Sequence, residues 1–127
     1  MSHPNFILLY VDNPQHSARF YAPLLDKQPI ESSPGFVMFA LDSGMMLGLW
    51  SKNNVEPAVP KIPLGGSGEL AFAVADIAAV KAMHTDWSQR GLQILQQPVR
   101  MDFGYTFTAA DPDGHRLRVF APSDPAL

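Results

Sequence analysis

Residues 111–120 read Asp-Pro-Asp-Gly-His-Arg-Leu-Arg-Val-Phe, a turn followed by an alternating strand. Pro112 presets φ for the turn, and Gly114 accepts a positive φ. After the turn, Leu117 and Val119 point to one side of the predicted strand, and the two arginines point to the other. The aliphatic side is expected to be buried, so the arginines mark the opposite face.

The first half of the chain carries a variant of the same arrangement. The turn Asp42-Ser43-Gly44 is followed by a strand that ends at Trp50. If the two segments are equivalent, Gly48 stands where Arg118 stands. Trp50 then corresponds to Phe120.

An offset of 63 residues relates the first strand and the helix start of the two halves. It connects Phe6 with Glu69 at the start of an apolar strand, and Asn13 with Asp76 at a helix cap. The predicted elements are strand 5–11, helix 14–25, strands 29–32, 35–41 and 45–50, then strand 69–74, helix 77–90 and strands 92–97, 105–109 and 116–121. Each half therefore reads β-α-β-β-β, and an internal duplication is the simplest account.

Composition favours a single folded domain, with 46% apolar and 17% charged residues in 127. It comprises a first module of about 4–51, a connector of about 52–66 and a second module of about 67–122.

The net charge of −3 argues against a nucleic-acid partner. The absence of cysteine excludes disulfides and thiolate chemistry. Without a long apolar run or a signal peptide, we expect a cytoplasmic protein with no membrane partner.

Two such modules, the second with Asp-Pro-Asp-Gly before its last strand, resemble the vicinal-oxygen-chelate superfamily. This superfamily includes glyoxalase I, extradiol dioxygenases and bleomycin-resistance proteins. The pair Phe20-Tyr21 late in the first helix also matches the usual pattern of these proteins. The resemblance covers nearly the whole chain and implies a single domain over about residues 4–122. It implies an α+β fold in which two βαβββ modules form a curved mixed sheet around a shared cavity. It also implies a homodimer with sites at the subunit interface.

Metal enzymes of this superfamily place their ligands on the first and last strand of each module. Carried onto this chain, those positions hold Phe6, Gly48, Glu69 and Arg118. Only the glutamate could bind a divalent ion, and a catalytic zinc typically takes three protein ligands. We therefore expect no metal, no cofactor and no catalytic residue. A metal-dependent glyoxalase- or dioxygenase-type enzyme with non-standard ligands is the alternative.

Several phrases point to a narrower resemblance within the superfamily. They are Leu9-Tyr10-Val11, Phe39, Leu49-Trp50-Ser51, Asp102-Phe103-Gly104, Thr106-Phe107 and Asp111-Pro-Asp-Gly-His115 with Arg118-Val119. These phrases look like those of phenazine-antibiotic resistance proteins, which hold a planar tricyclic ligand on aromatic side chains without altering it. The resemblance implies metal-independent sequestration of a planar aromatic antibiotic, a phenazine, that confers resistance.

Strand alternation gives an independent expectation for the cavity face. Residues two positions from the four family positions face the same side. That side mixes flat rings with small residues, whereas the opposite side is aliphatic, a profile that suits a planar and mostly apolar ligand. The predicted ligand-binding residues are Phe6, Tyr10, Phe39, Met46, Gly48, Trp50, Glu69, Tyr105, Phe107 and Arg118. Trp87, on the packed face of the second helix, is expected in the core.

Three uses of the charged residues on the cavity face stay open at this stage. Glu69 and Arg118 can form an ion pair with each other. Arg118 or Arg116 can instead face a carboxylate of the ligand. Glu69 can also act as an acid or base in metal-free chemistry on a bound ligand.

Overall fold

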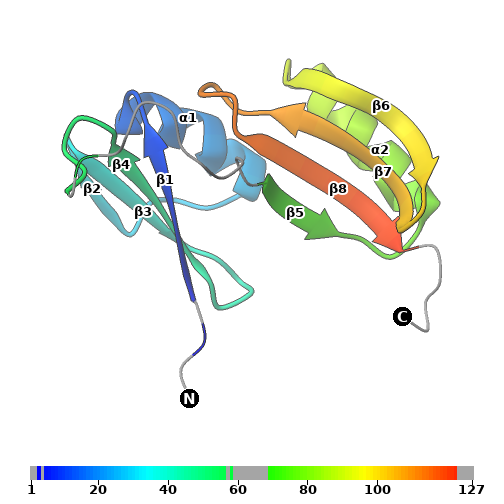
Figure 1. The fold of residues 1–127 in the computed structure, drawn as a ribbon, viewed down its shortest axis with the longest axis horizontal. Coiled ribbons are helices and arrows are strands. Elements are labelled where there is room, and N and C mark those ends of the chain that lie inside the picture. The colour runs from blue at the N-terminus through cyan, green and yellow to red at the C-terminus, as the bar shows by residue number, and fades with distance from the viewer. Residues whose placement is uncertain (1–2, 4, 57, 59–68, 123–127) are drawn as a thin grey trace. The chain divides into compact units, whose positions relative to one another are not determined.

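The structure is a computed structural model that describes residues 3, 5–56, 58 and 69–122. The chain divides into two compact units, residues 1–64 (unit 1) and 65–127 (unit 2), each with the order β-α-β-β-β (Figure 1). Unit 1 contains β1 (Phe6–Val11), α1 (Pro14–Leu25), β2 (Glu31–Ser33), β3 (Phe36–Ala40) and β4 (Met46–Ser51). Unit 2 contains β5 (Glu69–Ala73), α2 (Ile77–Gln89), β6 (Gln93–Met101), β7 (Gly104–Ala110) and β8 (Arg116–Pro122). This confirms the predicted α+β class. Of the predicted connector, residues 57 and 59–66 lie outside the described residues.

Each unit has a four-stranded mixed sheet in which the first and last strands are parallel neighbours. The strand orders are β1-β4-β3-β2 and β5-β8-β7-β6. Leu8 pairs with Gly48 in the first sheet, and Ala71 pairs with Arg118 in the second. Since Leu8 and Ala71 are 63 residues apart, the register repeats, and Gly48 and Arg118 occupy equivalent positions as predicted.

Parallel strands need a crossover connection, and in both units a helix supplies it on one face of the sheet. The two helices begin in the same way. The side chain of Asn13 accepts a hydrogen bond from the backbone N–H of His16 at 3.1 Å. The side chain of Asp76 accepts one from Ala79 at 2.8 Å. Each cap satisfies a donor that the first helical turn leaves unpaired. Neither helix is long and apolar enough to cross a membrane, and the described residues contain no other helix.

The core of each unit lies between its helix and the facing side of its sheet. The aliphatic strand residues predicted for this side are buried or half-buried, and Leu49 in unit 1 and Val119 in unit 2 are fully buried. Trp87 of α2 is 3% exposed and meets the rings of Phe72 and Phe107 edge-on, with centroids 5.4 Å away in both cases. The predicted core position of Trp87 is therefore confirmed. The helix of each unit covers one side of its sheet, and the side away from that helix is called the helix-free face of the unit.

Strand β6 is longer than the predicted strand 92–97, and it contains Pro98. It lies at the edge of its sheet, where a missing backbone N–H is tolerated. Its pairing with β7 shifts register between Ile94 and Gln96 and again between Gln96 and Val99. The shifts let the strand pass the proline and continue to Met101.

The turn between β6 and β7 requires a glycine at the first residue of β7. Gly104 has a φ of +147°, and a Cβ built on it would lie 2.0 Å from the carbonyl oxygen of Ala121. That oxygen belongs to the backbone of the neighbouring strand β8, so it cannot move aside without breaking the pairing. Gly104 is therefore needed for the conformation of the turn in which Phe103 lies.

We expect Gly104→Ala to lower the free energy of unfolding by about 3 kcal/mol or more, because the added methyl group meets fixed backbone. Gly44→Ala is the matched control. Gly44 also has a positive φ, +94°, but a Cβ there would have no neighbour within 4 Å. Its cost should stay near the 1–2 kcal/mol or so of the left-handed conformation alone. Urea denaturation measures both, and equal losses would contradict the steric argument.

Candidate functional site

The helix-free face of the unit 2 sheet holds an open pocket of about 440 Å³. It is lined by Glu69, Ala71, Phe103, Arg118 and Phe120. Strands β5 and β8 supply four of these residues, since alternate positions on paired strands face the same side. The volume lies within the range of small-molecule sites.

Arg118 lies at the centre of this face, with its side chain 17% exposed. Its Nε donates to Oε1 of Glu69 at 2.7 Å. Its Nη1 donates to Oε1 of Gln96 at 3.3 Å and to Oγ1 of Thr106 at 3.1 Å. Of the uses considered for the charged pair, the structure shows the ion pair between Glu69 and Arg118. Because the Glu69 side chain is 35% exposed, solvent screens the pair in part.

Two aromatic rings line the pocket together with Arg118. Phe103 and Phe120 meet edge-on, with ring centroids 6.0 Å apart and an interplanar angle of 76°. The Cζ atom of Arg118 lies 5.6 Å from the centroid of Phe103, within the range of a cation–π interaction. Phe103 is 42% exposed, so much of its surface is free to contact a ligand. The pocket thus combines flat apolar surfaces with a fixed cation.

Three polar residues of this face were not among the predicted site residues. They are Gln96 on β6, and Thr106 and Thr108 on β7. Thr108 pairs directly with Arg118 in the antiparallel register. The pairing of β7 with β8 could have predicted the two threonines, because residues opposite one another in a sheet share a face. Gln96 could not be placed, since it lies between two register shifts.

Three predicted ligand contacts lie on the other side of their sheets. Phe39 and Phe107 are completely buried, and Phe107 meets the rings of His84 and Trp87 from α2. Tyr105 is on the same side as Phe107, and its ring lies 5.8 Å from Nζ of Lys81 on α2. These three residues therefore belong to the helix-facing layer. The physical reason is strand alternation, which turns Thr106 and Thr108 to the pocket in their place.

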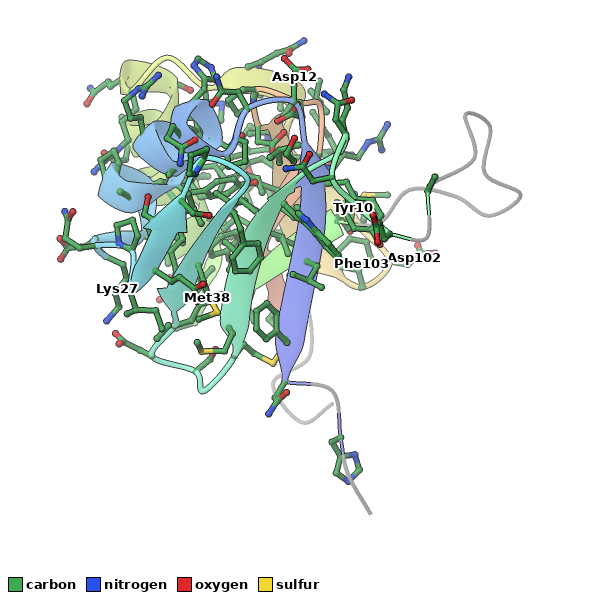
Figure 2. All side chains as sticks on the ribbon, turned by 90° about the vertical axis from the view of Figure 1, so that its left-hand side faces the viewer. Tyr10, Asp12, Lys27, Met38, Asp102 and Phe103 are labelled. Carbon is green, nitrogen blue, oxygen red and sulfur yellow. The ribbon has the colours of Figure 1, made fainter. Side chains whose placement is uncertain are left out.

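The helix-free face of unit 1 is apolar and aromatic. Phe6, Leu8 and Tyr10 alternate along β1 and are 40–44% exposed. Figure 2 shows Tyr10 on this strand. Tyr10 pairs with Trp50 on β4, and their rings meet edge-on at 6.3 Å. Met46, also predicted, shares this face because it pairs with Phe6. Five predicted residues of unit 1, including Gly48, thus lie on one face.

Gly48 does not leave an open space, contrary to expectation. A Cβ built on it would lie 2.6 Å from Leu8 Cδ2, 2.9 Å from Phe6 Cε1 and 3.0 Å from Phe36 Cε1. Neighbouring side chains therefore fill the space above the glycine. In unit 2 the sizes are reversed, with the small Ala71 on the first strand and the long Arg118 on the last.

The positions that hold metal ligands in the superfamily's enzymes do not fit a metal in this chain. Phe6 and Gly48 offer no donor, and the guanidinium of Arg118 is a cation. The remaining residue, Glu69, points a carboxylate oxygen at Nε of Arg118. One carboxylate already engaged in an ion pair does not make the ligand set of a divalent ion.

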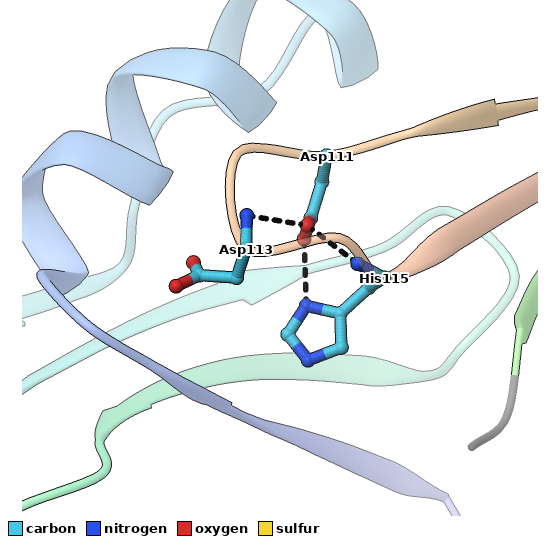
Figure 3. A group of neighbouring side chains, drawn as sticks. All are labelled: Asp111, Asp113 and His115. Carbon is cyan, nitrogen blue, oxygen red and sulfur yellow. Dashed lines mark hydrogen bonds and ion pairs between the residues drawn. The ribbon is translucent and has the colours of Figure 1, made fainter. Parts of the chain in front are cut away.

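A separate cluster of metal-binding residue types lies at the β7–β8 turn. Donor atoms of Asp111, Asp113 and His115 lie within 4.8 Å of one another (Figure 3). Oδ1 of the buried Asp111 accepts the backbone N–H groups of Asp113 and His115, both at 2.9 Å. Its Oδ2 lies 2.8 Å from Nδ1 of His115. These contacts explain why the three residues lie together: they stabilise the conformation of the turn.

Comparison with known proteins agrees with this architecture. The Glyoxalase/Bleomycin resistance protein/Dioxygenase superfamily matches residues 3–119. The chain belongs to this superfamily.

Its relatives include the phenazine antibiotic resistance protein EhpR of Enterobacter agglomerans. The two are 32% identical over 119 residues, which cover 91% of this chain and 89% of that protein. The solution structure of protein ATC0852 from Agrobacterium tumefaciens is 54% identical, with a TM-score of 0.86 over 98% of this chain and 100% of that one. A glyoxalase/bleomycin resistance protein/dioxygenase from Nocardioides shares the fold at 20% identity, with a TM-score of 0.82 over 98% and 87% of the two chains. The family therefore includes a resistance protein.

The contact between His115 and Asp111 in the β7–β8 turn predicts how the stability of the protein depends on pH. The hydrogen bond with Asp111 raises the pKa of His115 above its ordinary value of 6.5; burial opposes this, and the charges of Asp111 and Asp113 add to it. A raised pKa means that the folded protein binds the proton more tightly than the unfolded chain does. The stabilisation that protonated His115 contributes is thus complete below its pKa in the unfolded chain, and it is lost as pH rises through its higher pKa in the folded protein.

We therefore expect His115→Gln to lower the free energy of unfolding more at about pH 5.5 than at about pH 9. Urea denaturation at the two pH values measures the difference. His16→Gln, at an exposed position of α1, controls for the loss of a histidine as such. A loss from His115→Gln that is the same at both pH values would contradict the assignment.

Proposed function

We propose that this protein binds and sequesters a planar aromatic antibiotic, a phenazine, in the cytoplasm, without a metal and without altering the ligand chemically. The observation that carries the proposal is the unit 2 pocket. It is lined by the small Ala71, by the rings of Phe103 and Phe120 and by Arg118. Aromatic rings beside a small residue and one cation suit a planar aromatic ligand.

The energetics of such binding are sufficient without covalent chemistry. A ring pair contributes about 0.5–1.5 kcal/mol beyond the burial of area. Burial of apolar ligand surface adds about 25 cal/mol per Å², from which the cost of association is subtracted. Stacking and burial together support micromolar affinity, about −8 kcal/mol.

The relative EhpR supports the same ligand class, because it is a phenazine antibiotic resistance protein. The state of Glu69 favours binding over catalysis. Its carboxylate is held by Arg118, so it is not poised as a free base facing the pocket. The predicted contacts on the face of unit 1, Trp50 and Tyr10 among them, remain part of the proposal as further aromatic contacts of the ligand.

We expect saturable quenching of tryptophan fluorescence by phenazine-1-carboxylate, unchanged by EDTA, with the ligand recovered intact by mass spectrometry. Phe103→Ala should weaken binding about tenfold, because it removes an exposed pocket wall. Trp50→Ala, followed by equilibrium dialysis because it removes a fluorophore, tests the unit 1 contact in the same way.

The matched control is Ile77→Ala, which removes an apolar side chain of similar exposure from α2. It should leave the affinity unchanged. A titration that depends on EDTA, or a ligand recovered as a new compound, would favour the enzyme alternative. Unchanged affinity in Phe103→Ala would remove the pocket from the site.

We also propose that the protein is a homodimer with its sites at the subunit interface. The exposed apolar side chains of β1, Phe6, Leu8 and Tyr10, support a surface that a second copy covers. Light scattering at micromolar concentration should give the dimer mass. Leu8→Asp should shift the mass toward the monomer, because the charge would be buried unpaired. A monomeric wild-type protein would contradict this part of the proposal.

A further inference from the structure

We propose that Gln96 determines the charge selectivity of the unit 2 pocket, so that the pocket favours a planar aromatic ligand carrying one negative charge. This inference rests on the proposed binding function. It concerns a residue that lies behind Arg118, and its basis is the set of hydrogen bonds that the guanidinium makes.

The orientation of the Gln96 amide is fixed by its neighbours. Its Oε1 accepts from Nη1 of Arg118 at 3.3 Å and from Oγ1 of Thr108 at 3.1 Å. Its Nε2 faces Sδ of Met101 at 3.5 Å. A flipped amide would turn an NH₂ group toward the arginine, which can only donate. Gln96 therefore presents a neutral oxygen to Arg118.

Thr106 is also a neutral acceptor for the arginine. Its hydroxyl proton is donated to the backbone oxygen of Val119 at 2.8 Å. The oxygen is thus left to accept from Nη1 of Arg118 at 3.1 Å. Among the described residues, Glu69 is consequently the single anionic partner of this guanidinium.

The strand residues of this face carry one surplus positive charge. Its charged members are Glu69, Arg116 and Arg118, because Arg116 pairs with Glu69 and therefore lies on the same face as the ion pair. Within the part of the chain that the structure describes, Nη2 of Arg118 has no acceptor. An oxyanion of the ligand could accept from this nitrogen, and the surplus charge would favour it.

A glutamate in place of Gln96 would have nearly the same size and shape, but it would cancel the surplus charge. The neutral amide at this position is therefore what leaves the arginine available to an anionic ligand. The β6 register shifts on either side of Gln96 leave it paired with Thr108, where its amide oxygen accepts a hydrogen bond from Arg118, which lines the pocket.

The test compares phenazine-1-carboxylate with uncharged phenazine by equilibrium dialysis at neutral pH. We expect the wild-type protein to bind the carboxylate on the order of tenfold more tightly. Gln96→Glu should remove that preference and leave the affinity for phenazine within about twofold, because only the charge of the pocket changes.

Two variants complete the design. Gln97→Glu adds the same charge at the next, exposed position of β6 and should retain most of the preference. The double variant Glu69→Gln/Gln96→Glu exchanges the carboxylate and the amide around Arg118. It restores one anionic partner, so we expect it to recover the preference that Gln96→Glu loses.

The outcomes separate this inference from the function on which it rests. A wild-type protein that binds both probes equally overturns the charge selectivity and leaves the binding function intact. A wild-type protein that binds neither probe overturns both. Retention of the preference in Gln96→Glu, or equal losses in Gln97→Glu and Gln96→Glu, overturns the role of Gln96.

Discussion

The parallel pairing of the first and last strand in each unit is the constraint on which the rest of the structure depends. It requires a crossover helix, and the helix covers one side of the sheet only. The register then places Leu8 beside Gly48 and Ala71 beside Arg118. The main difference between the two helix-free faces follows from the side chains at those paired positions.

The two units use this common frame in opposite ways. In unit 1 the large side chains come from β1, and they close over the glycine of β4. In unit 2 the first strand contributes alanine, and β8 contributes the long side chain of Arg118. The first arrangement gives an apolar surface, and the second gives a pocket with a polar centre. Burial on the helix side is similar in both, because the aliphatic alternation is kept.

Sequence alone was sufficient for the architecture and for part of the site. The repeat of 63 residues and the capping residues Asn13 and Asp76 predicted the element order, because both are local signals. Alternation placed Arg118 and Phe120 on one face for the same reason. Continued across the pairing of β7 with β8, the same alternation puts Tyr105 and Phe107 on the helix side, contrary to their predicted contact with the ligand.

The residues that sequence reasoning missed depend on pairing between strands. Thr106 and Thr108 lie in a strand that is buried along almost its whole length, so composition does not distinguish its two sides. Gln96 follows one register shift and precedes another, and no period-two rule continues through such an irregularity. Phe103 lies in a turn, where alternation does not apply. Its position depends on the backbone contact of Gly104 with Ala121.

The repeated register also bears on how the superfamily changes over evolutionary time. A substitution at Gly48 or Arg118 alters the chemistry of a face, whereas the backbone pairing of the parallel strands needs no particular side chain there. Duplicated copies can therefore diverge at these positions while the helix-facing layer is conserved by packing. One scaffold can in this way acquire metal ligands in one lineage and an arginine beside an aromatic ring in another, which is consistent with a superfamily whose members include glyoxalases, dioxygenases and resistance proteins.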